Sequence, residues 1–167
     1  MMFVQKVKHR YTVRASSVED MLQQALQAEL QQWGMYVAYQ AVVRGPGRDG
    51  LSEHFLEHAE DEQSHAETLQ RHLVGRGIDP TRELLEIPDA EGWEDIIQLQ
   101  AQFEQKAIDT YQSILDALED DDSALRIDIE NILVKEQEHL HDLQLYLTEQ
   151  PEETEEDDTD EDGTEEE

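Results

Sequence analysis

Two Glu-x-x-His motifs could each hold a metal ion. Glu62 and His65 lie in the segment EDEQSHAETL, and Glu136 and His139 lie in VKEQEHLHDL. Residues three apart project from one face of a helix, so each motif can offer a carboxylate and an imidazole to one cation. Carboxylate oxygens combined with one imidazole per metal suit iron or manganese. The motifs therefore predict two related half-sites.

A further Glu-x-x-His pair, Glu138 with His141, overlaps the last motif but cannot share its face. An offset of two residues turns a helix by about 200°. Glu136 and His139 are the pair that falls within the apolar stripe of this segment. The stripe consists of Leu125, Ile129, Ile132, Leu133, Leu140, Leu143 and Leu147. We therefore expect Glu138 and His141 to form an exposed surface pair.

Two single glutamates complete the candidate donor set. Glu29 and Glu104 each lie in an apolar stripe, and each precedes a tyrosine by seven residues, Tyr36 and Tyr111. Residues equidistant from the turn of an antiparallel helix pair lie at one level. Positions 29 and 62 are equidistant from RGPGRDG, and positions 104 and 136 from EDDDS. We expect the six groups to share one level, and the tyrosines to be core residues bonded to a glutamate.

Long helices are needed to position these groups. Proline inside a helix costs about 3 kcal/mol, so Pro46, Pro80, Pro88 and Pro151 mark the breaks. The segments between them are rich in good helix formers and should form helices over about 18–44, 52–74, 91–118 and 120–148. No strand-like alternation competes with this pattern. The fold class is therefore all-α, a four-helix bundle over residues 17–150.

Local signals refine the ends of the helices and leave one connection open. Ser16 or Ser17 can cap the first helix, and Ser16 has Glu19 three residues later, which is a capping-box pattern. The joint between the second and third helices has about 14 residues, enough to span roughly 45 Å when extended. It could form a plain antiparallel hairpin or a long crossover, and the spacing of the candidate donors is compatible with both.

The ends of the chain differ from the bundle in charge. Residues 1–16 form a mildly basic N-terminal arm, which we expect to be disordered or packed rather than phosphate-binding. Residues 151–167 hold 12 acidic residues and no basic one, so we expect a disordered acidic C-terminal tail. The whole chain has a formal net charge of −30, which attracts cations and makes nucleic acid an unlikely partner.

Composition excludes several other classes of protein. The chain has no cysteine, which rules out disulfides and thiolate metal sites. No apolar run approaches the roughly 18 residues of a membrane span, and no secretory signal is recognisable. We therefore expect a cytoplasmic protein without a membrane partner.

The cost of burial decides between a metal site and a slightly polar core. Four carboxylates and two imidazoles at one level would repel one another, since no lysine or arginine lies in the stripes. Two divalent cations would balance the four carboxylates. The alternative, a bundle with surface Glu and His, explains a single pair well. It does not explain two motifs and two single glutamates that all lie on apolar faces, so a dinuclear metal site is favoured.

Other polar and aromatic residues are assigned structural roles. His58 and His72 are expected at the boundary of the core, although either could support the site. Glu57 and Asp61 are expected on a solvated acidic face, although they could hold a transient iron ion. Trp33 is assigned to the buried stripe of the first helix, as is Val37.

At these residues the chain resembles the ferritin-like superfamily. AELQQWGMYVAY, EDEQSHAETL, AQFEQKAIDTY and VKEQEHLHDL are similar to the ligand segments of bacterioferritins and of Dps-like proteins with a bacterioferritin-type di-iron centre. The resemblance implies a long B–C crossover between the second and third helices. It also implies bridging carboxylates at Glu62 and Glu136, terminal ligands at Glu29 and Glu104, and one iron each for His65 and His139.

Two departures from bacterioferritins matter. The position of the haem-ligating methionine holds Gln63, so we do not expect haem. No short fifth helix follows the bundle, which favours a dodecamer over a 24-mer as the homo-oligomer.

The resemblance implies a di-iron ferroxidase that oxidises Fe(II) with O2 or H2O2, for iron storage and protection against oxidative stress. Alternatives are a non-storing di-metal oxidase or peroxidase of the rubrerythrin or manganese-catalase type, and a non-catalytic metal-binding assembly protein.

Overall fold

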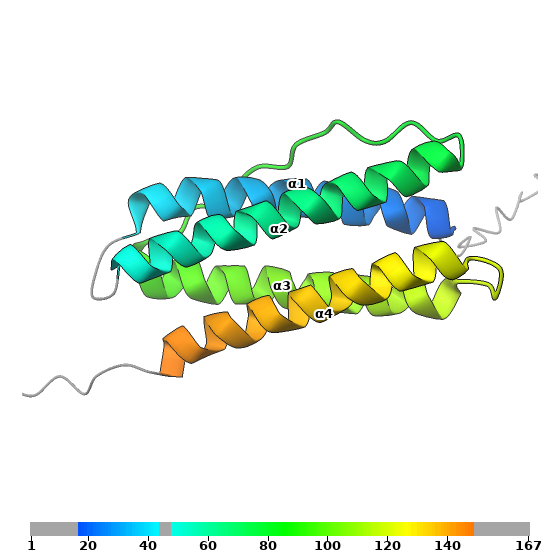
Figure 1. The fold of residues 1–167 in the computed structure, drawn as a ribbon. Coiled ribbons are helices and arrows are strands. Elements are labelled where there is room, and N and C mark those ends of the chain that lie inside the picture. The colour runs from blue at the N-terminus through cyan, green and yellow to red at the C-terminus, as the bar shows by residue number, and fades with distance from the viewer. Residues whose placement is uncertain (1–16, 44–47, 149–167) are drawn as a thin grey trace, which may run out of the picture.

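The computed structural model describes residues 17–43 and 48–148, and every regular element within them is an α-helix. The helices are α1 (Val18–Val42), α2 (Arg48–Gly75), α3 (Gly92–Ala117) and α4 (Ser123–Thr148), packed as a bundle (Figure 1). The predicted all-α four-helix bundle is confirmed. The predicted arm over 1–16 and the acidic tail over 151–167 lie outside the described residues. No helix of the described part is long and apolar enough to cross a membrane.

The first helix starts with a capping box one residue later than the Ser16–Glu19 pattern suggested. Ser17 is the N-cap, and its Oγ accepts a hydrogen bond from the backbone N–H of Asp20 at 3.1 Å. The Asp20 carboxylate accepts in turn from the backbone N–H of Ser17 at 3.2 Å. Because the helix begins at Val18, the reciprocal partner is Asp20 and not Glu19.

The end of α2 redirects the chain through a Schellman motif. Gly77 has a φ of +74°, a left-handed conformation that glycine adopts without a Cβ clash. The N–H of Ile78 bonds the carbonyl of Leu73 at 3.0 Å, and that of Gly77 bonds the carbonyl of Val74 at 2.9 Å. Ile78 also packs against the apolar cluster that contains Leu73. The motif therefore ends the helix and anchors the start of the next connection.

Residues 76–91 then run along α1 from one end of the bundle to the other (Figure 1). Side chains of α1 hold this crossover by its main chain. Gln23 donates to the carbonyl of Asp79 at 2.7 Å, Gln31 donates to that of Glu86 at 2.6 Å, and Tyr39 donates to that of Pro88. The crossover, and not a plain hairpin, therefore joins α2 to α3. As a result α1 packs on α3, α2 packs on α4, and α2 runs parallel to α3.

The core consists of two apolar clusters with a polar layer between them. One cluster includes Leu22, Leu26, Leu69, Tyr111 and Ile129, and the other includes Met35, Phe55, Ile97 and Leu143. Glutamate, histidine and glutamine side chains occupy the buried positions between the clusters on all four helices. The layer lies near the middle of the bundle, where the helices shield it on every side.

The predicted burial of Trp33 and Val37 is wrong. Trp33 is 38% exposed and Val37 is 39% exposed. The inward position on this turn of α1 belongs instead to Gln32, which is buried and donates a hydrogen bond to Glu104. Gln32 and Tyr36 thus occupy the inner face of α1 here, and the two apolar residues lie at its edge.

Candidate metal centre

All six predicted donor residues lie together in the buried polar layer. Each is at most 6% exposed, and every helix contributes at least one. The set is Glu29 from α1, Glu62 and His65 from α2, Glu104 from α3, and Glu136 and His139 from α4. Glu138 and His141 are exposed, as predicted. The expectation that the four helices bring these side chains to one level is met by the geometry.

The first group of donors surrounds His65. Its Nδ1 lies 2.8 Å from Oε1 of Glu136 and 3.3 Å from Oε2 of both Glu29 and Glu62. One donor atom from each of these residues lies within 4.8 Å of every other. Three carboxylates and one imidazole therefore lie close enough together to surround a single ion.

The second group surrounds His139. Its Nδ1 lies 3.3 Å from Oε1 of Glu62, 3.8 Å from Oε1 of Glu104 and 4.0 Å from Oε2 of Glu136. Glu62 and Glu136 thus face His65 with one oxygen and His139 with the other. Glu29 belongs only to the group around His65, whereas Glu104 belongs to the group around His139 and also lies close to His58. This is the arrangement that two bridging and two terminal carboxylates require around a pair of cations.

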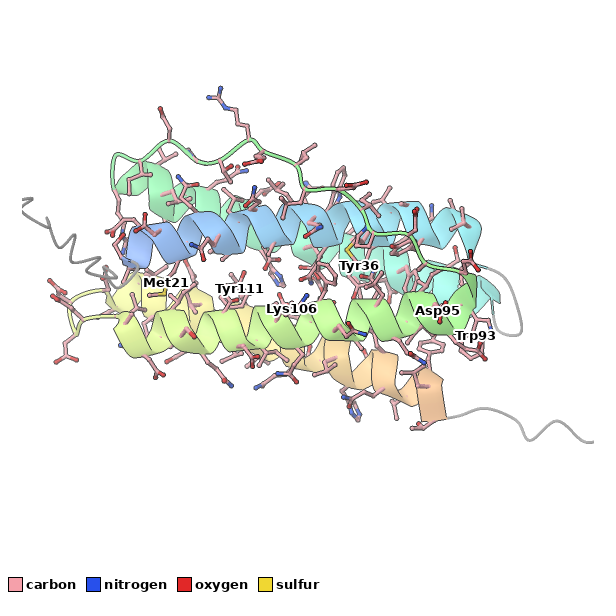
Figure 2. The ribbon with its side chains drawn as sticks, turned by 180° about the vertical axis from the view of Figure 1, so that it is seen from behind. Met21, Tyr36, Trp93, Asp95, Lys106 and Tyr111 are labelled. Atoms are coloured by element: carbon pink, nitrogen blue, oxygen red, sulfur yellow. The ribbon has the colours of Figure 1, made fainter. Side chains whose placement is uncertain are left out.

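Two tyrosines bind the terminal glutamates across the bundle. The hydroxyl of Tyr111 donates to Oε1 of Glu29 at 2.5 Å, and that of Tyr36 donates to Oε1 of Glu104. Figure 2 shows both tyrosines between α1 and α3, at different positions along the bundle. The predicted tyrosine–glutamate hydrogen bonds are confirmed. Each tyrosine donates its hydrogen bond to the glutamate of the other hairpin, so these bonds also join α1 to α3.

The surroundings of His139 correct two sequence assignments. His58 is 3% exposed and not a boundary residue, and its ring stacks on that of His139 with centroids 4.0 Å apart. Asp61 is half-buried, and its Oδ2 lies 3.2 Å from Nε2 of His139. Position 58 is one turn before Glu62, so it shares the inward face of α2. Glu57 is exposed, as expected.

The Asp61 contact has a chemical consequence. A carboxylate that accepts from Nε2–H of His139 fixes the tautomer that leaves Nδ1 free of a proton. That nitrogen is the one that faces Glu62, Glu104 and Glu136. The contact therefore prepares His139 to bind a cation.

Electrostatics in the layer favour protonated carboxyls when no cation is present. Burial and then the neighbouring carboxylates raise the pKa of Glu62 and of Glu104 well above the ordinary value. The same causes raise the pKa of Glu136 to about 8. A cation would reverse this balance, because it stabilises the ionised form of every acid around it.

Glu29 and His65 behave as an ion pair within the layer. Burial would raise the pKa of Glu29, but hydrogen bonds with His65, Glu62 and Tyr111 bring it below the ordinary value. Burial likewise opposes the charged form of His65, yet its contacts with Glu136, Glu29 and Glu62 raise its pKa well above the ordinary value. A proton on His65 thus occupies part of the space that a cation would take.

The donor atoms fit a metal ion in one further respect. Oε1 of Glu62, both carboxylate oxygens of Glu136 and Nδ1 of His139 are buried without a hydrogen-bond partner among the described residues, although Oε1 of Glu136 closely approaches His65. Buried polar atoms normally have partners, because leaving one unpaired costs about 1–3 kcal/mol. These four atoms all belong to the two donor groups, so a cation pair would satisfy them together.

Two buried glutamines were not anticipated from the sequence. Gln32 donates from Nε2 to Oε2 of Glu104 at 3.2 Å. Gln100 is fully buried with its amide unpaired. Both could have been found by helical spacing, because Gln32 follows Glu29 by three residues and Gln100 precedes Glu104 by four.

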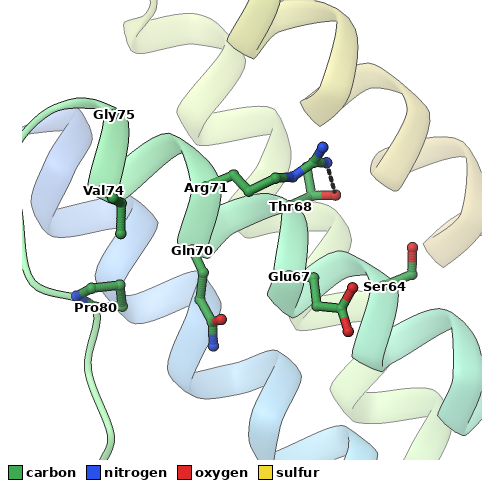
Figure 3. Close-up of a pocket in the computed structure, with 8 residues that line it drawn as sticks. All are labelled: Ser64, Glu67, Thr68, Gln70, Arg71, Val74, Gly75 and Pro80. Carbon is green, nitrogen blue, oxygen red and sulfur yellow. Dashed lines mark hydrogen bonds between the residues drawn. The ribbon is translucent and has the colours of Figure 1, made fainter.

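Two cavities approach the centre from opposite sides of the bundle. One of about 310 Å³ lies between α1 and α3 and is lined by Glu29 and Tyr111, among others. Another of about 260 Å³ lies between α2 and α4 and reaches His65 and Asp61. A larger hollow of about 780 Å³ lies between α2 and the crossover, and none of the six donors lines it (Figure 3). Small solutes can therefore approach the donors through α1–α3 or α2–α4.

Comparison with known proteins identifies the family. The family model described as the ferritin-like domain matches residues 19–151, which is most of the chain. The chain belongs to the ferritin-like family. The resemblance noted at the four ligand segments is thereby confirmed, together with the ferritin-like fold. No curated protein matches this ferritin-like chain.

Solved structures extend the comparison. The bacterioferritin-related protein of Bacteroides fragilis, described as a dodecameric thioferritin, is 28% identical, with a TM-score of 0.73 over 78% of this chain and 84% of that one. A ferritin-like diiron-carboxylate protein from Bacillus anthracis str. Ames is 25% identical, with a TM-score of 0.75 over 78% of this chain and 94% of that one. The carboxylate and histidine groups of this ferritin-like chain fit the di-metal site that such relatives imply.

Proposed function

We propose that this ferritin-like chain is a di-iron ferroxidase that oxidises Fe(II) with O2 or H2O2. The observation that carries the proposal is the pair of donor groups that share Glu62 and Glu136. Two cations held by common carboxylates can act on one oxidant molecule together. The family and the description of a relative as a diiron-carboxylate protein support iron as the metal, with manganese as the alternative.

In this proposal the six donors have distinct roles. Glu62 and Glu136 bridge the two ions, and Glu29 with His65 completes the ligands of one ion. Glu104 with His139 completes the ligands of the other. Hydrogen bonds from Tyr111 and Tyr36 hold the terminal glutamates in place, and Asp61 holds the proton on Nε2 of His139.

The chemistry is a two-electron reduction of the oxidant. Each of two Fe(II) ions supplies one electron, so that O2 with two protons gives H2O2, or H2O2 with two protons gives two water molecules. The chain contributes a buried site between two apolar clusters, which excludes bulk water. Its carboxylates also bind tightly to the more highly charged product, which favours oxidation electrostatically.

We further propose a homo-oligomer of the dodecameric type that takes part in iron storage and protection against oxidative stress. The relative from Bacteroides fragilis is described as dodecameric, and it covers most of this chain. A cytoplasmic location remains part of the proposal. Size-exclusion chromatography with light scattering distinguishes a cage of about 12 subunits from a dimer.

A direct test compares two neighbouring glutamates on α4. Glu136→Gln removes one negative donor from the centre, whereas Glu138→Gln changes an exposed residue two positions away. Fe(II) oxidation is followed by ultraviolet absorbance under O2 and under H2O2. We expect Glu136→Gln to lose most of the rate and Glu138→Gln to match the wild type. Equal rates for Glu136→Gln and wild type would refute the proposed centre.

A further inference from the structure

A second cluster of metal-binding side chains lies beside the six-residue centre. His54 and His58 come from α2, and Asp142 comes from α4. One donor atom from each lies within 4.8 Å of the other two. Two of these residues, His54 and Asp142, have no part in the proposed di-iron centre. The cluster is therefore a separate place where a cation could bind.

Helix geometry explains why these three side chains meet. His54 and His58 are four residues apart, so they lie one turn apart on the same face of α2. Their ring centroids are 4.2 Å apart, with the ring planes at 54°. Asp142 lies three residues after His139 on α4, which packs against α2. A pair of histidines at this spacing is a frequent basis for binding zinc and related ions.

The separation of the donors is close to that of ligands on one ion. Nε2 of His54 lies 3.6 Å from Oδ2 of Asp142, which is too long for a hydrogen bond. Ligands held about 2.1 Å from a tetrahedral ion are roughly 3.4 Å apart. A cation between these two atoms would need little movement of either side chain.

A separate observation points to a missing ligand at this place. Nε2 of His54 is shielded from solvent and has no hydrogen-bond partner among the described residues. A cavity of about 250 Å³ opens next to it and is lined by His54, Asp142, Leu145 and Tyr146. The cavity gives a small ion access from solvent and leaves room for water ligands.

We propose that His54, His58 and Asp142 bind a third cation in each chain. Two imidazoles and one carboxylate suit a divalent first-row ion such as zinc or Fe(II), with water in the open position. The site is distinct from the proposed di-iron centre, because it needs none of the six donors. The stacked rings of His58 and His139 place the two sites next to each other.

The residues to change are His54 and Asp142. His58 is a poor choice, because its Nδ1 lies 3.1 Å from the hydroxyl of Tyr36 and a substitution there would disturb the neighbouring centre. His54 and Asp142 are partly exposed, so His54→Ala and Asp142→Asn should fold normally. His141→Ala is the matched control, since His141 is exposed on α4 next to Asp142.

The test uses the full chain and zinc, which is not oxidised. Crystals soaked in zinc are measured at the zinc absorption edge, and zinc per chain is counted after equilibrium dialysis. We expect an anomalous peak among His54, His58 and Asp142 in the wild type and in His141→Ala. The peak and one zinc ion per chain should be lost in His54→Ala and in Asp142→Asn.

A further variant separates this site from the proposed di-iron centre. Glu62→Ala combined with Glu136→Ala should abolish the zinc ions at that centre and retain the third peak. A wild type with zinc at the six donors and none at His54 would overturn the third site alone. Persistence of the third peak in His54→Ala would overturn it equally. Zinc at His54 with none at the six donors would overturn the di-iron centre alone.

Discussion

In the α1–α2 hairpin, Glu29 and Tyr36 on the first helix are followed by Glu62 and His65 on the second. The α3–α4 hairpin repeats this order with Glu104, Tyr111, Glu136 and His139. Both hairpins therefore contribute a single glutamate, a tyrosine and a Glu-x-x-His motif to one buried layer.

The residues around the two copies of this pattern are different. Equivalent positions, counted from the glutamates, hold His58 and Ile132, Asp61 and Lys135, Gln32 and Ala107, and Gln100 and Ala25. Three of the polar residues contact Glu104 or His139: Gln32 bonds Glu104, and both His58 and Asp61 contact His139. Ala25 and Ala107 line a cavity with Glu29. The ligand pattern is thus duplicated, whereas the environment is not.

This difference indicates that the two proposed cation positions are unequal. The position near His139 has ligands oriented by hydrogen bonds with Gln32 and Asp61, and the described residues show no equivalent bonds in the group around His65. A positioned ligand loses less freedom on binding, so the His139 position should bind its cation more tightly. The following experiments test whether the donor groups around His65 and His139 bind their cations together or independently.

The largest effect is expected from a shared carboxylate. Glu62→Ala removes one oxygen from each donor group, so both cations should be lost. His65→Ala removes a donor from one group and should leave the other cation bound. Bound iron per chain and the Fe(II) oxidation rate report both outcomes. We expect a rate loss greater than the roughly 10–100-fold that supporting residues cause.

Glu57→Ala is the matched control for Glu62→Ala, because it removes an exposed acid from the same helix. Retention of both cations by Glu62→Ala would show that the two donor groups do not share this carboxylate.

A smaller effect is expected from the support of His139. Asp61→Asn removes the carboxylate that accepts from Nε2 of His139, and should weaken one cation by roughly 10–100-fold. The other cation should keep its affinity, because the equivalent residue on α4 is Lys135, whose ammonium donates a hydrogen bond to Glu138. Competition with a chelator, monitored by calorimetry, measures both affinities. Glu60→Gln, at an exposed neighbouring position, serves as control.

The pH dependence of the metal-free protein should reveal the carboxyl cluster. The pKa of Glu136 is raised to about 8 from an ordinary 4.5, so its folded form holds a proton that the unfolded form releases. Stability from this group is therefore complete below pH 4.5 and is lost as pH rises toward 8. The slope is at most about 1.4 kcal/mol per pH unit for one group.

The informative window lies between pH 6.5 and 8, where His65, whose pKa is also raised, loses stability in the same direction as Glu136. Burial lowers the pKa of His58 to about 2 from 6.5, so its opposite contribution varies only below pH 6.5. Thermal unfolding should show a falling Tm across this window without metal and a smaller fall with manganese bound. A flat profile without metal would contradict the raised pKa of Glu136.

The smallest effect is expected at Gln100, whose counterpart in the other hairpin is Ala25. Both atoms of its buried amide lack hydrogen-bond partners among the described residues. Gln100→Met removes this unpaired amide at similar volume and should stabilise the metal-free protein by about 1 kcal/mol. Unlike Gln100→Met, Gln102→Met changes a surface residue of α3 and should leave Tm unchanged. A lower Tm for Gln100→Met would show that the amide has a partner when the protein is in solution.

The sequence predicted which Glu and His side chains gather in the buried layer, because their signal is local. Helical spacing places Glu62 with His65 on one face, and distance from the turn gives the level. The sequence could not decide between a hairpin and a crossover. The path of the connection depends on hydrogen bonds such as that from Gln31 to the carbonyl of Glu86, which is distant in the sequence. Trp33 was misplaced because hydrophobicity cannot show that a polar neighbour, Gln32, has a buried partner. The burial of His58 was not predicted, because the ring on which it stacks, that of His139, lies on another helix.

The crossover is held almost entirely through its backbone. Gln23, Gln31 and Tyr39 all donate to main-chain carbonyls, and a carbonyl is present whichever side chain occupies the position. Ile78 and Ile87 are exceptions, since Ile78 packs against an apolar cluster and Ile87 packs closely against Gly34. Most side chains of the crossover can therefore be substituted in protein engineering. Substituting the three anchoring residues of α1 should instead detach the crossover from that helix.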